Sequence, residues 1–261
     1  MSEELARVER RGSVVVVTLA RETRANALSR ALIIELGRIG AELAASDTVR
    51  AVVLTGSGDK AFCAGADLKE RQGMAPDAVR EQLRLYQSEL SWLRQLAVPT
   101  VAAINGIALG GGLELALLCD LRVAAEHAVL GLPETSLGII PGAGGTQLLP
   151  RLIGEARAKE LILRGSRVNA REALALGLVN RVTDPEHAVL EDTLEWLRPI
   201  AEGAPIAQRA ALRAVRVALD MPLAEGLEFE RALYDGCLES EDRNEALRAF
   251  AEKRPPRFVG R

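Results

Sequence analysis

Two glutamates stand in apolar surroundings beside glycine-rich stretches, and their type and setting suit acid/base chemistry. Glu114 interrupts the apolar run Leu113–Leu118, directly after three consecutive glycines. Glu134 lies in another largely apolar segment, just before the glycine-rich stretch 142–145. Burial raises the pKa of a carboxyl group toward the working range of a general acid or base. Each glutamate alone also fits a plain role, Glu114 in the first turn of a helix and Glu134 in a solvated loop. Together they predict a catalytic pair.

The glycines before Glu114 add a second chemical element, backbone N–H groups that can face a ligand. Glycines 110–112 follow a predicted strand and open a predicted helix, whose first amides have no partner within the helix. Such amides can hold an oxygen that gains negative charge, and losing one donor of this kind typically lowers a rate about 10²–10³-fold. The small residues within 62–69 could supply a further amide. The sequence therefore predicts an acid/base pair next to an oxyanion site.

These segments lie in a chain in which apolar strands alternate with amphipathic helices, a pattern typical of an α/β fold. The predicted elements are strands at 14–19, 51–55 and 100–104, a helix at 29–45 capped by Ser29, and a long helix at 76–96. After Pro185 the pattern indicates three or four helices, with breaks at 203–205, 221–222 and 239–243. We therefore expect a core over residues 1–195 that carries the site, followed by a helical region over 196–261.

Composition and charge exclude several classes of protein. Hydrophobic residues make up 48% and charged residues 26% of the 261 residues, a globular balance. A net charge of -3 argues against a nucleic-acid partner. Three cysteines without metal-like spacing and only two histidines argue against a metal site and against a serine-peptidase triad. No apolar run reaches membrane-spanning length and no signal core opens the chain, so we expect a cytoplasmic location without a membrane partner.

In combination, these motifs resemble the crotonase (enoyl-CoA hydratase/isomerase) family. The likeness runs from about Val14 to Pro256 and is strongest in FCAGADLKE (62–70), NGIALGGGLELAL (105–117) and GLPETSLGIIPGAGGTQLLPR (131–151). It implies a crotonase-like spiral of ββα units, followed by a helical C-terminal region that forms homotrimers or hexamers. It also implies an acyl-CoA thioester as substrate, with no cofactor beyond the CoA that the substrate carries.

The resemblance also implies roles for individual residues. The two glutamates that position one water in the family's hydratases fall on Glu114 and Glu134, and family isomerases generally lack the first. Glu114 would activate the water that attacks the β-carbon, and Glu134 would protonate the α-carbon. The two oxyanion amides fall on Ala64 and Gly111. Contacts with substrate and CoA are expected from Arg24, Ala64, Gly65, Ala66, Asp67, Leu68, Gly110 and Gly111, and from Phe250 and Lys253 toward a neighbouring subunit's CoA.

Within the family, the strongest likeness is to methylglutaconyl-CoA hydratases, through 62–71, 108–117, 120–125 and the terminal stretch 252–258. It implies hydration of 3-methylglutaconyl-CoA in leucine or isovalerate metabolism. The alternative is a general short-chain enoyl-CoA hydratase of fatty acid β-oxidation. The distal carboxylate of a methylglutaconyl chain should need a partner that is cationic or donates several hydrogen bonds. The cationic candidates near the expected acyl pocket are Lys69, Arg71, Arg80 and Arg84.

Such hydratases are also described as binding AU-rich RNA, which offers an alternative of a different class. The helix implicated there corresponds to 29–45, where Arg30 and Arg38 are separated by Ile34 and accompanied by two glutamates. This pattern gives no basic stripe, so we expect no nucleic-acid partner.

Overall fold

Runs of β-branched and aliphatic residues form the centre of the larger sheet in this computed structural model, which describes residues 4–261. The expected core of 1–195 therefore begins three residues outside the described part. Within that part, the larger sheet consists, in spatial order, of β1 (Ala6–Arg11), β2 (Val14–Leu19), β3 (Ala51–Gly56), β5 (Thr100–Ile104), β7 (Leu121–Ala125) and β10 (Arg181–Thr183). Neighbouring strands run parallel except β1 and β2, which form an antiparallel hairpin.

The smaller sheet carries the chemically interesting loops. Its order is β4 (Ala61–Cys63), β6 (Ile107–Leu109), β8 (Val129–Gly131) and β9 (Arg167–Asn169). The first three strands are parallel, and β9 is antiparallel to β8. Because the carboxyl ends of parallel strands meet at one edge of a sheet, the segments after β4, β6 and β8 lie together, and these are the three segments that carry the motifs.

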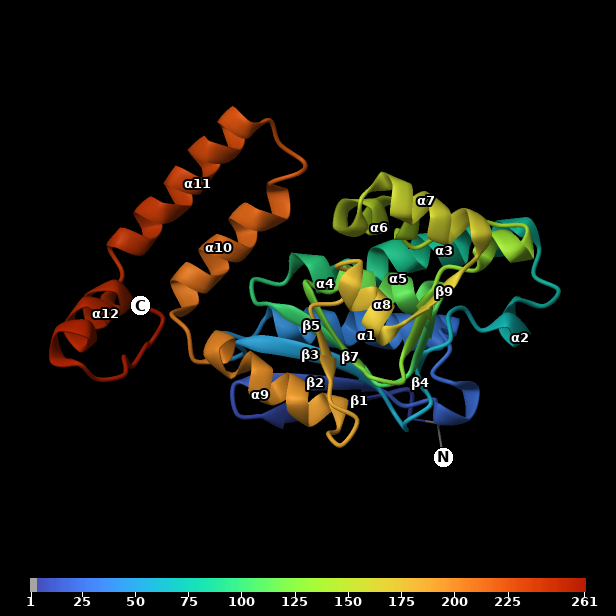
Figure 1. Cartoon of the computed structure of the whole chain (residues 1–261), viewed down its shortest axis with the longest axis horizontal. Coiled ribbons are helices and arrows are strands. Elements are labelled where there is room, and N and C mark those ends of the chain that lie inside the picture. The colour runs from blue at the N-terminus through green and yellow to red at the C-terminus, as the bar shows by residue number, and fades with distance from the viewer. Residues whose placement is uncertain (1–3) are drawn as a thin grey trace.

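Helices cover both sheets (Figure 1). In chain order they are η1 (Glu22–Arg24), α1 (Arg30–Ala44), α2 (Leu68–Arg71), α3 (Pro76–Leu90), α4 (Trp92–Gln95), α5 (Gly111–Leu118), η2 (Glu134–Leu137), α6 (Gly145–Ile153), α7 (Glu155–Arg164), α8 (Ala170–Ala175), α9 (Val189–Ala201), α10 (Pro205–Val217), α11 (Leu223–Leu238) and α12 (Glu241–Glu252). The mixture of two sheets and covering helices confirms the predicted α/β class.

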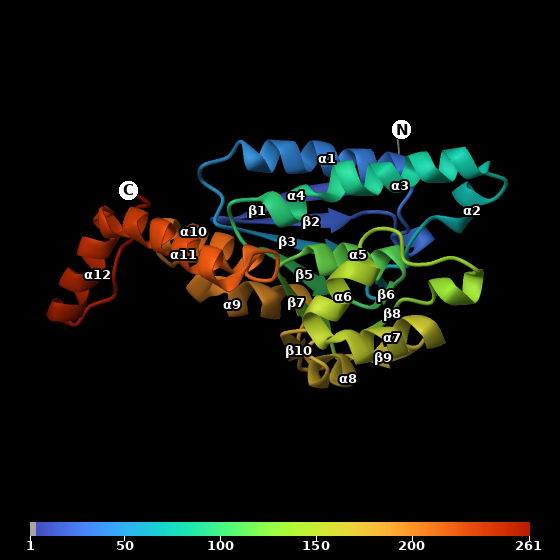
Figure 2. The ribbon, with the colours of Figure 1, turned by 90° about the horizontal axis from the view of Figure 1, so that it is seen from above.

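Helices α1 and α3 lie side by side along one face of the larger sheet (Figure 2). Ser29 caps α1 as predicted, because its hydroxyl accepts a hydrogen bond from the Leu32 amide at 3.2 Å. The predicted long helix 76–96 is interrupted at Ser91, whose hydroxyl donates to the Ser88 carbonyl. The break turns Trp92 onto Gly40 of α1, where a Cβ would lie 2.2 Å from the indole ring.

The C-terminal helices differ in their relation to the core. The expected boundary at 195 falls inside α9, whose Thr193 and Leu197 are fully buried, so the core continues to the end of this helix. Helices α10, α11 and α12, hereafter the C-terminal arm (residues 205–252), extend away from the sheets (Figure 1). Arg216 fastens α10 to the core through Asp120, with N–O distances of 2.7 and 2.8 Å. In the described chain, no helix has both the length and the hydropathy that a membrane span requires.

Candidate active site

The turn between β6 and α5 places Glu114 at the bottom of a cavity. Gly110 adopts a φ of +53° there, a conformation that side chains with a Cβ rarely take. Gly112 packs so closely on the β4 end that a Cβ would lie 2.0 Å from the carbonyl oxygen of Cys63. Glycine at these positions lets α5 start directly against the neighbouring strand, with Glu114 one turn inside the helix.

Two backbone amides hold the Glu114 carboxylate. Its Oε1 accepts hydrogen bonds from the amides of Ala143 at 2.7 Å and Gly145 at 2.8 Å, both in the glycine-rich segment before α6. Only 3% of the residue is exposed, and this burial raises the pKa of Glu114, although the amide bonds oppose the shift. The glycine-rich segment therefore orients the Glu114 carboxylate through its Oε1 atom.

Glu134 enters the same cavity from η2, directly after Pro133. Burial raises the pKa of its carboxyl group to about 7, and the nearby charge of Glu114 contributes in the same direction. Its Oε2 atom is buried and has no hydrogen-bond partner in the part of the chain that the structure describes. Near neutral pH this carboxyl group therefore exists in both protonation states, which suits a proton donor.

Backbone amides of two loops meet beside these carboxyl groups, but one of them differs from the predicted residue. The Ala64 amide donates to the Ala25 carbonyl at 3.0 Å, so it is not free to bind an oxyanion. The amides of Ala66 and Gly111 have no hydrogen-bond partner within residues 4–261. A Cβ on Gly111 would lie 3.6 Å from the Ala66 nitrogen, so the two free amides border the same space. The geometry replaces Ala64 by Ala66 as the partner of Gly111.

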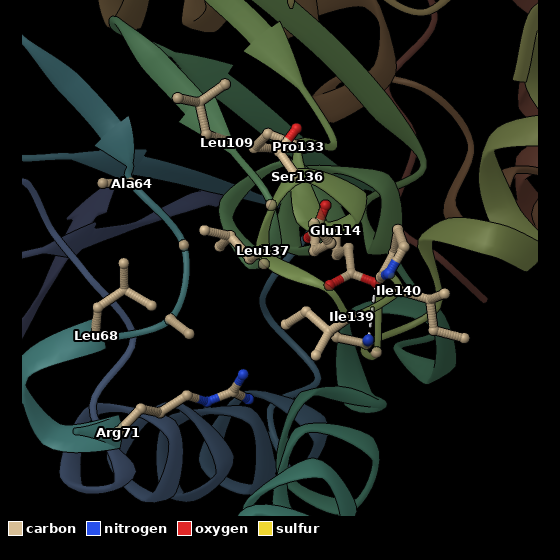
Figure 3. Close-up of a pocket in the computed structure, with 18 of the residues that line it drawn as sticks. Ala64, Leu68, Arg71, Leu109, Glu114, Pro133, Ser136, Leu137, Ile139 and Ile140 are labelled. Atoms are coloured by element: carbon tan, nitrogen blue, oxygen red, sulfur yellow. Dashed lines mark hydrogen bonds between the residues drawn. The ribbon is translucent and has the colours of Figure 1, made fainter. Parts of the chain in front are cut away.

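The cavity that these groups share has a volume of about 1020 Å³. Of the predicted contact residues, its lining includes Ala64, Gly65, Ala66, Leu68, Gly110, Gly111 and both glutamates. Apolar side chains from the η2 side, including Leu137, Ile139 and Ile140, make up much of the remaining wall (Figure 3). The site therefore combines two ionisable carboxyl groups and two free amides with an apolar wall.

Asp67 does not line the cavity but anchors the loop that does. Its carboxylate accepts from the amides of Lys69 and Glu70 at the start of α2 and from the guanidinium of Arg21 at 3.0 Å. The Arg21–Asp67 pair is largely buried. Sequence reasoning missed Arg21, because nothing local to it indicates a partner 46 residues away.

The other predicted CoA contacts lie outside the cavity lining. Arg24 is exposed in η1, and the adjacent Ala25 is the residue that accepts the Ala64 amide, so the η1 loop lies against one rim of the cavity. Phe250 and Lys253 lie at the end of α12, at the opposite extremity of the molecule from α2 (Figure 1). Phe250 is 87% exposed. Within one chain these two residues do not serve the cavity.

Of the four cationic candidates, Arg71 lines the cavity, whereas Lys69 and Arg80 do not. Arg84 borders an adjoining cavity of about 600 Å³ on the other side of Tyr86. Tyr86 belongs to both walls. It was not singled out from the sequence, where it is one apolar position among several on α3.

The cysteines show no reactive setting. Burial raises the pKa of Cys63 and of Cys119 to about 12, so both thiols are protonated at neutral pH. Among the described residues, no three His, Cys, Asp or Glu side chains gather in a way that could hold a metal ion. The Nε2 atom of His127 lies within hydrogen-bond distance of the backbone oxygens of Asp59 and Asn105.

Known proteins resemble the chain along nearly its whole length. Residues 9–261 match the family model described as enoyl-CoA hydratase/isomerase. The protein YngF of Bacillus subtilis is 50% identical over 247 residues, which cover 95% of each chain. Mouse mitochondrial methylglutaconyl-CoA hydratase is 43% identical over 255 residues, which cover 97% of this chain and 81% of that protein. The crystal structure of enoyl-CoA hydratase from Bacillus anthracis matches with a TM-score of 0.96 at 48% identity, covering 99% of this chain and 100% of that one.

Proposed function

This chain belongs to the enoyl-CoA hydratase/isomerase family, the crotonase family, and on that premise we propose that its cavity adds water across the 2,3 double bond of a short enoyl-CoA thioester. The observation that carries the hydratase assignment is the meeting of two buried carboxyl groups and two free amides around one cavity. An isomerase that moves a proton between carbons needs one carboxyl group, whereas adding water calls for a second group to orient the nucleophile.

The two free amides bind the thioester. The carbonyl oxygen of the substrate accepts hydrogen bonds from Ala66 and Gly111, and these bonds strengthen as the oxygen becomes enolate-like. The Gly111 amide sits at the start of α5, where the helix dipole adds to the effect. The apolar wall around Ile139 and Ile140 excludes bulk water from the reacting carbons.

The two glutamates act as base and acid in the addition of one water molecule. Glu114, ionised and oriented by its two amide bonds, accepts a proton from the water while the water oxygen bonds to the β-carbon. The electrons of the double bond shift toward the thioester oxygen. Protonated Glu134 then gives its proton to the α-carbon, which leaves Glu114 protonated and Glu134 ionised. Transfer of the proton from Glu114 to Glu134 through the next water molecule returns both residues to their starting states. The net change is one hydroxyl group on the β-carbon and one hydrogen on the α-carbon.

For the acyl group we propose 3-methylglutaconyl-CoA. The 43% identity to the mouse methylglutaconyl-CoA hydratase supports this choice, and so does the guanidinium of Arg71 in the cavity wall. The largely apolar remainder of the wall favours the second candidate, a general short-chain enoyl-CoA hydratase.

Kinetics on two esters test the proposal. We expect kcat/KM for hydration of 3-methylglutaconyl-CoA to exceed that for crotonyl-CoA, because a site built for a polar group can discriminate by up to about 10⁴ and an extra methylene by only about 10–200-fold. Equal or better efficiency with crotonyl-CoA would make the chain a general short-chain enzyme. Isomerisation without hydration would remove the hydratase assignment.

The remaining predictions concern partners and location. Arg30 is paired with Glu81, and Arg38 with Glu35 and Glu42, so α1 presents no free basic stripe, and we propose no nucleic-acid partner. Assembly into a homotrimer or hexamer through the C-terminal arm is part of the proposal, supported by the arm's exposed apolar residues. A cytoplasmic location stays a prediction, because the relatives include a mitochondrial mouse enzyme.

A further inference from the structure

Arg71 lines the cavity but takes no part in the hydration chemistry. Its Nε donates to Oε1 of Gln82 at 3.0 Å, and Gln82, on α3, is only 1% exposed. Within residues 4–261, the two terminal nitrogens of the guanidinium have neither a hydrogen-bond nor an ion-pair partner. Figure 3 shows this group reaching into the cavity from α2, on the side facing Glu114.

Hydrogen bonds restrain Arg71 both at its backbone and at its guanidinium group. The Arg71 amide donates to the Asp67 carbonyl at 3.0 Å, and Asp67 is fixed by Arg21. At the other end the buried amide group of Gln82 holds Nε. An arginine restrained in this way loses little conformational freedom when a ligand binds, and its two terminal nitrogens form the fork that matches the oxygens of a carboxylate.

Among the described residues, no acceptor bonds the terminal nitrogens of Arg71. Burial keeps the pKa values of Glu114 and Glu134 raised even though the charge of Arg71 opposes the shift, so neither glutamate serves as its permanent counter-ion. The Tyr86 hydroxyl and the Nε2 atom of Gln82 are buried without partners in the described chain. Because the terminal nitrogens of Arg71 have no acceptor in the described chain either, acceptor oxygens on a ligand in the cavity would satisfy them.

We propose that Arg71 is the specificity-determining residue that binds the distal carboxylate of a dicarboxylic acyl chain, and that Gln82 positions it. This inference rests on the proposed function, because it assumes that the acyl part of a CoA ester enters this cavity. It selects Arg71 from the four candidate cations as the partner of the carboxylate. It also gives α3 a role in substrate specificity, because Gln82 lies on that helix.

Binding of two unreactive CoA esters tests the inference. Glutaryl-CoA and pentanoyl-CoA have acyl chains of equal length that differ in the terminal carboxylate, and neither has a double bond to hydrate. We expect the wild type to bind glutaryl-CoA more tightly in calorimetry. In Arg71→Met this preference should fall roughly 10–100-fold, the usual effect of removing a hydrogen bond to a charged group. Arg71→Lys, which keeps the charge but lacks the fork, should retain part of it.

Matched variants separate recognition from general damage. Arg80→Met removes the same charge from an exposed arginine that pairs with Asp77 outside the cavity, and it should leave the preference intact. Gln82→Leu should weaken the preference less than Arg71→Met does, because the guanidinium stays but loses its support. A wild type without preference, or an equal loss for both esters in Arg71→Met, would overturn the inference. Because neither ester reacts, a preserved preference in an enzyme that fails to hydrate enoyl esters would contradict the proposed function alone.

Discussion

The carboxyl groups of Glu114 and Glu134 differ in their hydrogen-bond partners, although burial raises the pKa of both. Two backbone amides bind Glu114 and favour its ionised form, whereas Glu134 has one buried oxygen without a partner. In the proposed mechanism, this difference suits Glu114 to act as the base that orients water and Glu134 to act as an acid that can give up a proton near pH 7. The chemistry of each residue thus follows from its neighbours rather than from its type.

We predict that Glu114→Gln and Glu134→Gln each lower kcat for enoyl-CoA hydration by about 10²–10⁴-fold, because each variant loses a positioned acid/base group. Affinity for a saturated CoA ester should change little, since the thioester is bound by amides. If both residues act on one water, the loss of activity in the double variant should be much smaller than the product of the two single losses. Stopped-flow or steady-state rates decide this, and near wild-type turnover in Glu114→Gln would remove the mechanism.

The same burial should lower the stability of the fold above neutral pH. The folded-state pKa of Glu134, about 7, lies above its ordinary value of 4.5, so the native protein binds more protons between these values and its stability falls as the pH rises through them. Because glutamine does not titrate, the Glu134→Gln variant does not lose stability in this way. We predict that it is more stable than the wild type at pH 8, by at most about 3 kcal/mol, with the gain absent below pH 4.5. Urea unfolding at both pH values measures it, and a gain independent of pH would contradict the stated cause.

At the level of residues, the sequence pointed to the two glutamates that line the cavity but not to the second free amide, that of Ala66. A carboxylate inside an apolar run is a visible exception, so Glu114 and Glu134 could be found. Every residue of 62–66 carries a backbone amide, and the free one depends on where the others donate. The Ala25 carbonyl, 39 residues before Ala64, occupies the Ala64 amide and leaves that of Ala66 free.

At the level of elements, the proposed oxyanion site depends on where α5 begins. The helix starts at Gly111, so the Gly111 amide has no helical acceptor and points out of the helix end. Two elements could not be predicted from the hydrophobic pattern alone: the break within the predicted helix 76–96, and the charged strand β1. The helix breaks at Ser91, whose hydroxyl donates to the Ser88 carbonyl, and Trp92 then packs against α1. Strand β1 carries charged side chains because it is an exposed edge strand.

Gly111→Pro tests the helix start directly. Proline is tolerated in the first turn of a helix, so the variant should fold while losing the amide hydrogen. We predict a loss in kcat of about 10²–10³-fold, the usual effect of removing one oxyanion donor. Gly111→Ala keeps the amide, and its Cβ would lie 3.5 Å from Leu28, an ordinary contact, so it should lose less activity. Circular dichroism checks folding, and an active, folded proline variant would show that this amide is not used.

At the scale of the whole molecule, the C-terminal arm exposes an extensive apolar surface. Helix α11 has no buried residue in the described chain. Four apolar side chains of the arm are between 50% and 79% exposed: Val215, Leu219, Leu223 and Leu227. Apolar exposure on this scale typically marks an association surface. Phe250 and Lys253 lie at the end of this arm, and α12 lies at the opposite extremity of the molecule from α2 (Figure 1). A second copy is the occupant that accounts for both facts, since it would cover the arm and could bring these residues to its partner's site.

We therefore predict that the protein sediments at three or six times 28.0 kDa at micromolar concentration. The double substitution Leu223→Glu and Leu227→Glu places two charges one turn apart on α11, and it should shift the distribution toward the single chain because burying them in an interface is unfavourable. Leu163→Glu is the matched control, since Leu163 on α7 is also 72% exposed but lies outside the arm. If Phe250 and Lys253 serve a neighbouring site, the dissociated variant should show a raised KM for the CoA ester with its glutamates and amides untouched. A wild type that sediments only at 28.0 kDa would contradict the prediction, and so would a control that dissociates as readily as the double variant.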